Sequence, residues 1–238
     1  MAVRDGGAVW LLTPRAARGC TLGRVGLDGR RRGPARPVSC ATKLLGETSA
    51  GLLLAVSPPN GSDDPWDRPT VLLDRRGRIT RLGFPAAEVV AAHGHLLLRS
   101  AEPREPLTLT DLRDGNSWRL AWPSRLRGGV HVARMHPGGR LLAVGFHGLA
   151  SEGEEGYDLW LLDTATRRWR HLPDLPAADV PAKGTDMAWT RDGRLVVLTG
   201  TFGLGEVVAL WRPDQPRLAV RRLALPGRTA SSATFVVR

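Results

Sequence analysis

The chain has 238 residues, of which 42% are hydrophobic and 24% charged, a composition typical of a folded globular protein. It contains no run of about 18 apolar residues, which excludes a membrane-spanning helix of ordinary length. The formal net charge is +11, but Lys43 and Lys183 are its only lysines, and the arginines are spread along the sequence. This spread favours solvated surface charge over a nucleic-acid interface.

Five short segments repeat one pattern, a turn that ends in glycine followed by an apolar run. Their glycines are Gly6, Gly51, Gly94, Gly139 and Gly193, so successive segments start 43 to 54 residues apart. A period of this size is that of a propeller blade of four strands.

In the first unit, Cys20 and Cys40 flank an expected turn, Asp28–Arg32, centred near Arg30. The two thiols would then face each other across a hairpin, where opposite Cα atoms lie about 4.5–5.5 Å apart, within disulfide range. We expect a disulfide and an oxidising, extracytoplasmic setting. The alternative is two unrelated thiols in a cytosolic protein, and the first residues show no signal peptide. Without a nearby His or further Cys, the pair does not predict a zinc site.

The later units each contain four expected strands, an inner strand first and an outer strand last. Third strands recur at Val71–Asp74 and Leu107–Asp111, each followed by a turn. The last two units are clearest, with expected strands at Val130–Met135, Leu141–Phe146, Tyr157–Leu162 and Arg168–Leu172, then at Thr185–Thr190, Leu195–Thr199, Glu206–Trp211 and Arg217–Leu225. Outer strands alternate polar with apolar residues, which places the arginines on a solvent-facing rim.

The two ends of the chain complement each other. Only Met1–Arg4 precede the first turn, whereas Ser231–Arg238 has the pattern of an inner strand without successors. We therefore expect one all-β domain over 1–238, a monomeric propeller of five four-stranded blades closed by the C-terminal strand. The alternative is an open part of a larger ring, whose unpaired strands would tend to associate. The expected blades cover approximately 1–40 with 229–238, 41–85, 86–124, 127–176 and 183–226.

Two turns and one strand carry a family resemblance. His136–Ala143 and Thr190–Val196 resemble the Pro-Asp-Gly turn repeat of TolB-like and WD40-like bacterial β-propellers, and Tyr157–Thr166 resembles their third strand. The resemblance extends over most of the chain but is well developed only in the last two full blades. It implies an envelope or secreted scaffold that binds proteins, peptides or small ligands, and it transfers no catalytic residue.

Polar residues on the expected inner strands are the candidates for a binding site, because inner strands converge at the channel of a propeller. They are Glu47, Glu88, His131, Arg134 and Asp186. The alternative is that these side chains are solvated or pair with one another. Two longer loops, Gly148–Gly156 and Leu175–Gly184, are candidates for a rim that contacts a partner.

We predict a non-enzymatic binding or scaffold propeller of the bacterial cell envelope or exterior, without a catalytic residue, bound metal or cofactor. Its ligand would be a protein, peptide or small molecule held at a channel mouth or loop rim. The alternative is a metal-dependent hydrolase or lyase in the central channel, for which Glu47, Glu88 and Asp186 are the acidic candidates.

Overall fold

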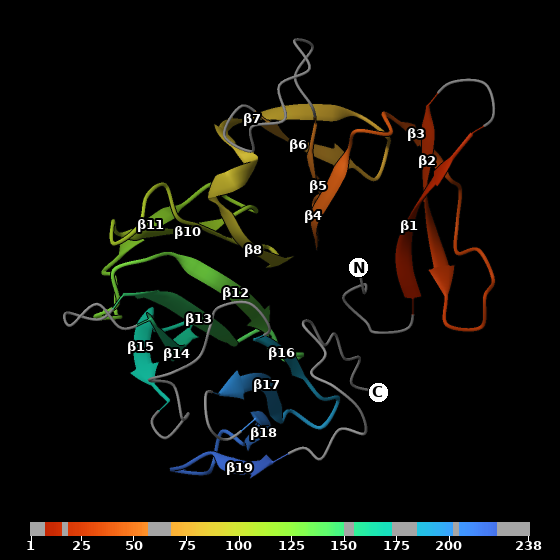
Figure 1. Cartoon of the computed structure of the whole chain (residues 1–238). Helices are drawn as coiled ribbons and strands as arrows, with labels where there is room; N and C mark the ends of the chain where they lie inside the picture. The colour runs from red at the N-terminus through yellow and green to blue at the C-terminus, as the bar shows by residue number, and fades with distance from the viewer. Residues whose placement is uncertain are drawn as a thin grey trace. The chain divides into compact units, whose positions relative to one another are not determined.

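The computed structural model describes residues 8–15, 19–56, 68–149, 155–172, 185–201 and 205–222 (Figure 1). These residues form nineteen strands and one short 3-10 turn, η2 (Ala86–Glu88), and none of them is in an α-helix. The all-β prediction is confirmed. The chain divides into two compact units: unit 1 is Met1–Ala101 with Thr108–Arg119, and unit 2 is Glu102–Leu107 with Leu120–Arg238.

Unit 1 contains a three-stranded sheet and a larger mixed sheet. The three-stranded sheet has the order β1 (Ala8–Pro14), β2 (Cys20–Gly26), β3 (Arg36–Val38). The larger sheet contains the antiparallel run β4 (Lys43–Thr48), β5 (Gly51–Ala55), β6 (Pro69–Asp74), β7 (Ile79–Pro85), and the antiparallel run β8 (Val89–Gly94), β9 (Leu96–Arg99), β10 (Leu107–Asp111), β11 (Ser117–Leu120). The first strands of these runs, β4 and β8, pair in parallel, as inner strands of neighbouring blades would.

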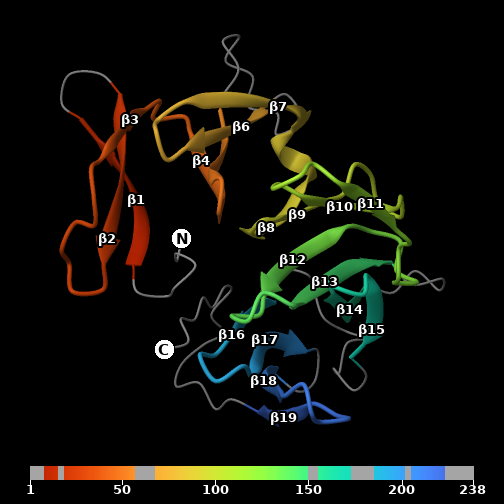
Figure 2. The ribbon, with the colours of Figure 1, turned by 180° about the vertical axis from the view of Figure 1, so that it is seen from behind.

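Unit 2 contains two four-stranded antiparallel sheets, whose strand order follows the sequence. The strands are β12 (Val130–Met135), β13 (Leu141–Leu149), β14 (Glu155–Asp163), β15 (Arg168–His171), then β16 (Asp186–Trp189), β17 (Leu195–Thr201), β18 (Gly205–Trp211), β19 (Ala219–Arg222). Figure 2 shows the first of these sheets from behind. A buried cluster joins the two sheets, with Leu159 and Leu161 from one and Val197 and Trp211 from the other.

The hairpins form where the sequence supplies the turn residues. Between β6 and β7, the Asp74 carboxylate accepts hydrogen bonds from the backbone N–H groups of Arg76 and Arg78, at 2.9 and 2.8 Å. Gly77 closes this turn at φ 87°, a conformation that costs glycine little because it has no Cβ. Gly193 does the same between β16 and β17 at φ 78°.

The loop predicted over Gly148–Gly156 is partly strand. β13 and β14 continue their pairing through His147 with Tyr157 to Leu149 with Glu155. The two strands are therefore longer than their apolar cores, Leu141–Phe146 and Tyr157–Leu162, had indicated. The second predicted loop, Leu175–Gly184, lies outside the described residues.

The sheet β1–β3 has one strand fewer than the four-stranded runs. No described strand lies on the free side of β1, and on this strand Leu11 and Leu12 are 46% and 39% exposed. The predicted closing strand, Ser231–Arg238, falls outside the described residues. Closure into five blades, and a single domain over 1–238, therefore remain predictions.

The predicted disulfide is present between Cys20 and Cys40, whose Cα atoms are 4.8 Å apart. The expected register of its hairpin is wrong. Val25 pairs with Arg31, so the turn is centred on Asp28 and not on Arg30. The β2–β3 ladder itself is centred on Gly29, so that Cys20 faces Val38, and Cys40 reaches Cys20 diagonally from the turn after β3.

Candidate binding site on the inner strands

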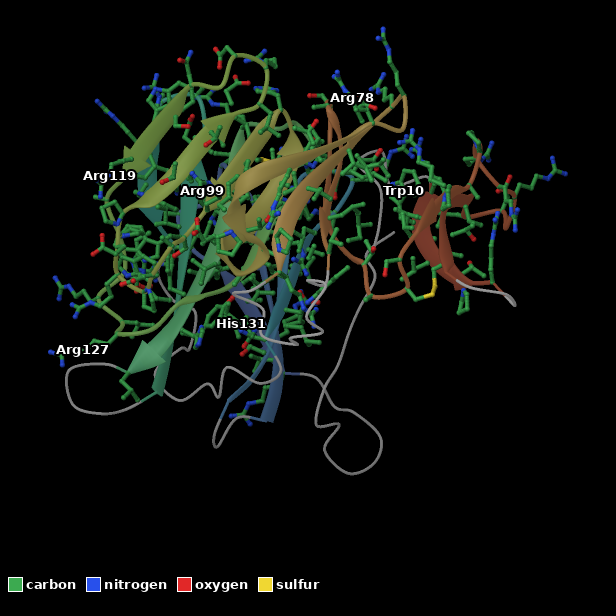
Figure 3. The ribbon with its side chains drawn as sticks, turned by 90° about the horizontal axis from the view of Figure 1, so that it is seen from above. Trp10, Arg78, Arg99, Arg119, Arg127 and His131 are labelled. Atoms are coloured by element: carbon green, nitrogen blue, oxygen red, sulfur yellow. A yellow bond between two sulfur atoms is a disulfide. The ribbon has the colours of Figure 1, made fainter. Side chains whose placement is uncertain are left out.

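Three of the five predicted site residues meet in unit 2, on strands β12 and β16. Arg134 on β12 donates a hydrogen bond from Nη2 to Oδ1 of Asp186 on β16, at 2.9 Å. His131, labelled in Figure 3, lies earlier on β12, and its Nε2 is 3.0 Å from the carbonyl oxygen of Thr185, which precedes Asp186. Arg134 and Asp186 therefore pair with each other across neighbouring strands, and His131 lies on the same strand as Arg134; a ligand-binding role for the three remains a prediction.

The backbone around the ion pair is held from both sides. The Asp186 carboxylate also accepts a hydrogen bond from the Met187 N–H at 2.8 Å, and the Trp189 indole donates to the Arg134 carbonyl at 2.8 Å. The Arg134 side chain remains 47% exposed and that of Asp186 27% exposed. The pair is therefore fixed at its base and accessible at its charged end.

A buried tyrosine lies beside this ion pair. Tyr157 is 2% exposed, and its hydroxyl has no hydrogen-bond partner among the residues that the structure describes. Burial raises the pKa of this phenol, and the charge of Asp186 raises it further, while Arg134 acts in the opposite direction. An unsatisfied hydroxyl in a protein interior requires an explanation, because leaving it unpaired costs about 1–3 kcal/mol.

The tyrosine fits because Gly145 on β13 leaves room for its ring. A Cβ at Gly145 would overlap the Tyr157 hydroxyl and the adjoining ring carbon, and would lie 3.1 Å from the terminal methyl group of Met187. No sequence motif marks Tyr157 as a site residue. Its one signal was that it is the only tyrosine in the chain.

The other two predicted residues lie in unit 1. Glu47 on β4 accepts a hydrogen bond from the Trp10 indole at 3.1 Å and pairs in register with His93 of β8. Glu88 lies in η2, just before β8, and its carboxylate is 3.0 Å from Nη1 of Arg99. The five candidates therefore form two sets, one in each unit.

A second polar cluster in unit 2 is centred on Asp158 of β14. Its carboxylate accepts hydrogen bonds from Ser124 Oγ and Trp160 Nε1, each at 2.7 Å, and Nε2 of His171 lies 2.7 Å away. In a nucleophilic triad the histidine stands between the serine and the acid. Here the acid is central, so the imidazole is not placed to take the serine proton, and the cluster ties the segment before β12 to β14 and β15.

The part of the chain that the structure describes contains no group of three or more His, Cys, Asp or Glu side chains arranged to hold a metal ion. Among the same residues, no helix is long and apolar enough to cross a bilayer. Three carboxylates close together in the sequence, Asp63, Asp64 and Asp67, are of the kind that binds calcium, but they lie outside the described residues.

No protein-family model matches the chain, and no curated protein sequence matches it. Solved structures do match. Dipeptidyl peptidase 4 of Porphyromonas gingivalis matches 94% of this chain with a TM-score of 0.57 at 12% identity. An uncharacterized protein of Listeria monocytogenes EGD-e matches 92% with a TM-score of 0.54 at 11% identity, and Kuenenia stuttgartiensis hydrazine synthase 93% with a TM-score of 0.52 at 12% identity.

These neighbours are all-β, propeller-like structures. This chain shares their fold. It spans 40%, 67% and 64% of their respective lengths, and at this low identity the likeness establishes the fold alone.

Proposed function

We propose that the chain is a non-enzymatic binding platform of the bacterial cell envelope or exterior, a TolB-like or WD40-like propeller of five blades. Propeller-like neighbours support the architecture, and a disulfide supports an extracytoplasmic location. The incomplete sheet supports closure: β1 has no described strand on its inner side, and Ser231–Arg238 has the apolar pattern of the strand that this side lacks. In a closed ring the edge of β1 is paired, so it is not available for pairing with a second copy of the chain, and the protein is expected to be a monomer.

The observation that carries the binding role is the position of the unpaired Tyr157 hydroxyl beside the Arg134–Asp186 pair. Proteins depart from full hydrogen-bond satisfaction mainly where function requires it. Asp186 Oδ2 makes no hydrogen bond to a described residue, and Arg134 keeps donors beyond those it uses for Asp186 and the Ala133 carbonyl. The site can therefore offer an acceptor and a donor of opposite charge to one ligand.

A peptide with free termini matches this chemistry. Its ammonium group would approach Asp186, and its carboxylate would approach Arg134, which binds carboxylates through planar paired donors. A peptide with both termini free can pair with Asp186 and Arg134 at the same time. When it replaces the Arg134–Asp186 ion pair, neither side chain is left without a partner of opposite charge.

The acidic residues of the rival hydrolase or lyase are already engaged. Glu47 accepts from Trp10, Glu88 pairs with Arg99, and Asp186 pairs with Arg134. These contacts support structural and binding roles for the carboxylates over ligation of a divalent ion.

The test follows the Trp189 indole signal by NMR, because this N–H donates to the Arg134 carbonyl. We expect trialanine to shift the signal and the acetylated, amidated peptide to leave it unchanged. Arg134→Gln should abolish the response, whereas Arg99→Gln, a matched change in unit 1, should not.

Metal analysis of the purified protein tests the rival directly. A signal that millimolar trialanine does not move contradicts binding at this strand pair. A stoichiometric divalent ion that is lost in Glu47→Ala or Asp186→Ala would favour the hydrolase or lyase instead.

A further inference from the structure

Two arginine-rich turns of unit 1 lie beside each other. One is the β2–β3 hairpin, with Arg30, Arg31, Arg32 and Arg36, and the other is the β6–β7 turn, whose first strand ends at Asp74. We call the seven arginines of both turns the arginine strip: Arg30, Arg31, Arg32, Arg36, Arg75, Arg76 and Arg78. Arg36 and Arg75 are 39 positions apart in the sequence, so the sequence alone gives no sign that these two turns meet.

Arg36 joins the two turns. Its guanidinium donates to the carbonyl oxygens of Asp74 and Arg75, the latter at 2.9 Å from Nη2. In Figures 1 and 2 the β3 end of the hairpin lies next to the start of β7, and Figure 3 labels Arg78 at this edge of the unit. Arg36 is therefore committed to holding the strip together.

The strip has more positive charge than its own acids neutralise. Asp28 pairs with Arg32 at 2.9 Å, and Asp74 pairs with Arg78 at 3.4 Å. The side chains of Arg30, Arg31, Arg75 and Arg76 are exposed and make no ion pair with a described residue. These four guanidinium groups are available to a partner.

Apolar side chains accompany the free charges. Leu27, at the tip of the hairpin, is 73% exposed, and Ile79, directly after Arg78, is 63% exposed. They are the two most exposed large hydrophobic residues in the described part of the chain. Each turn thus presents two free arginines and one exposed aliphatic side chain.

We propose that the arginine strip binds an acidic protein segment in which carboxylates alternate with apolar side chains. Guanidinium groups pair with carboxylates through two parallel hydrogen bonds, and Leu27 and Ile79 would bury apolar surface against the segment. A nucleic acid would use the charges but would leave both aliphatic side chains exposed. Among the described residues of the two turns, none is an aromatic on which bases could stack. This inference depends on the fold of unit 1 and not on the proposed peptide site in unit 2.

The experiment measures fluorescence anisotropy of three probes with the full chain: the labelled peptide (Glu-Leu)8, labelled polyglutamate of equal charge, and single-stranded oligothymidylate of equal charge. The test variant is Arg30→Gln/Arg31→Gln/Arg75→Gln/Arg76→Gln. A matched control removes four exposed arginines of unit 2 and has the same net charge: Arg191→Gln/Arg212→Gln/Arg221→Gln/Arg222→Gln.

We expect the (Glu-Leu)8 peptide to bind most tightly, with affinity that falls as salt rises. The strip variant should weaken it at least tenfold and the control less than twofold. Leu27→Ser/Ile79→Ser should reduce affinity for (Glu-Leu)8 to that for polyglutamate. If both quadruple variants lost affinity for (Glu-Leu)8 equally, the binding would depend only on net charge, and the proposal would be overturned. Tighter binding of oligothymidylate than of the peptide would assign the strip to nucleic acid, and no binding of any probe at low salt would also refute it.

Discussion

Replacing Tyr157 with phenylalanine should make the folded protein more stable. The change removes only the phenolic hydroxyl, which is buried and unpaired within the described structure, and leaves the ring in place over Gly145. Since an unsatisfied buried hydroxyl costs about 1–3 kcal/mol, we expect the free energy of unfolding to rise by about 1–2 kcal/mol. For a domain of this size that gain raises Tm by roughly 2–8 °C.

The pH dependence should change as well. The pKa of Tyr157 is raised above its ordinary value of 10.0 in the folded protein, mainly because of burial. The folded state therefore holds this proton more tightly than the unfolded state, and stability is lost as pH rises above about 10. The phenylalanine variant lacks this loss, so its advantage should widen between pH 9 and pH 11.

The assay is urea unfolding of both proteins, followed by tryptophan fluorescence at pH 7 and at intervals up to pH 11. A loss of 1 kcal/mol or more at pH 7 would refute the reasoning, because it would mean that the hydroxyl is hydrogen-bonded in the folded protein.

Three further substitutions test other parts of the structure. Cys20→Ser/Cys40→Ser opens a loop of 20 residues and should lower the free energy of unfolding, measured with urea, by about 3 kcal/mol. A reductant should produce the same loss in the parent protein and no loss in the variant. Gly145→Ala should cost about 1–3 kcal/mol in the same measurement, because the new methyl overlaps the tyrosine; an unchanged midpoint would contradict the packing. Hydrogen bonds from Arg113 hold the pKa of Asp111 at about 2, below its ordinary value of 3.8. The pair therefore contributes stability that is lost as pH falls from about 4 to 2. Arg113→Gln should flatten that part of the plot of unfolding free energy against pH.

Local sequence signals predicted the strands well. Turn glycines such as Gly193 mark positions where the backbone needs positive φ, and apolar runs such as Leu195–Thr199 mark the buried strands between them. Both signals act within a few residues, so they can be read along the chain. Arg134 and Asp186 meet because their strands, β12 and β16, lie side by side, and the sequence pattern assigned each residue to an inner strand without indicating this contact.

Register and long-range contacts could not be predicted in this way. The disulfide forms although the strands beside it are centred on Gly29 and not on Arg30, because Cys40 reaches Cys20 from beyond the end of β3. The Asp158 cluster depends on Ser124, which is 34 residues away, and no pattern in either segment indicates the contact. The arginine strip likewise arises from packing between two hairpins.

The central claim is that five blades close through the C-terminal strand, and amide hydrogen exchange of β1 tests it most directly. In the full chain we expect the amides of Val9–Thr13 to be protected on both sides of the strand. In a chain ending at Arg228 they should exchange at least tenfold faster on the side away from β2. Equal exchange in the two chains, or fast exchange on that side in the full chain, would contradict closure.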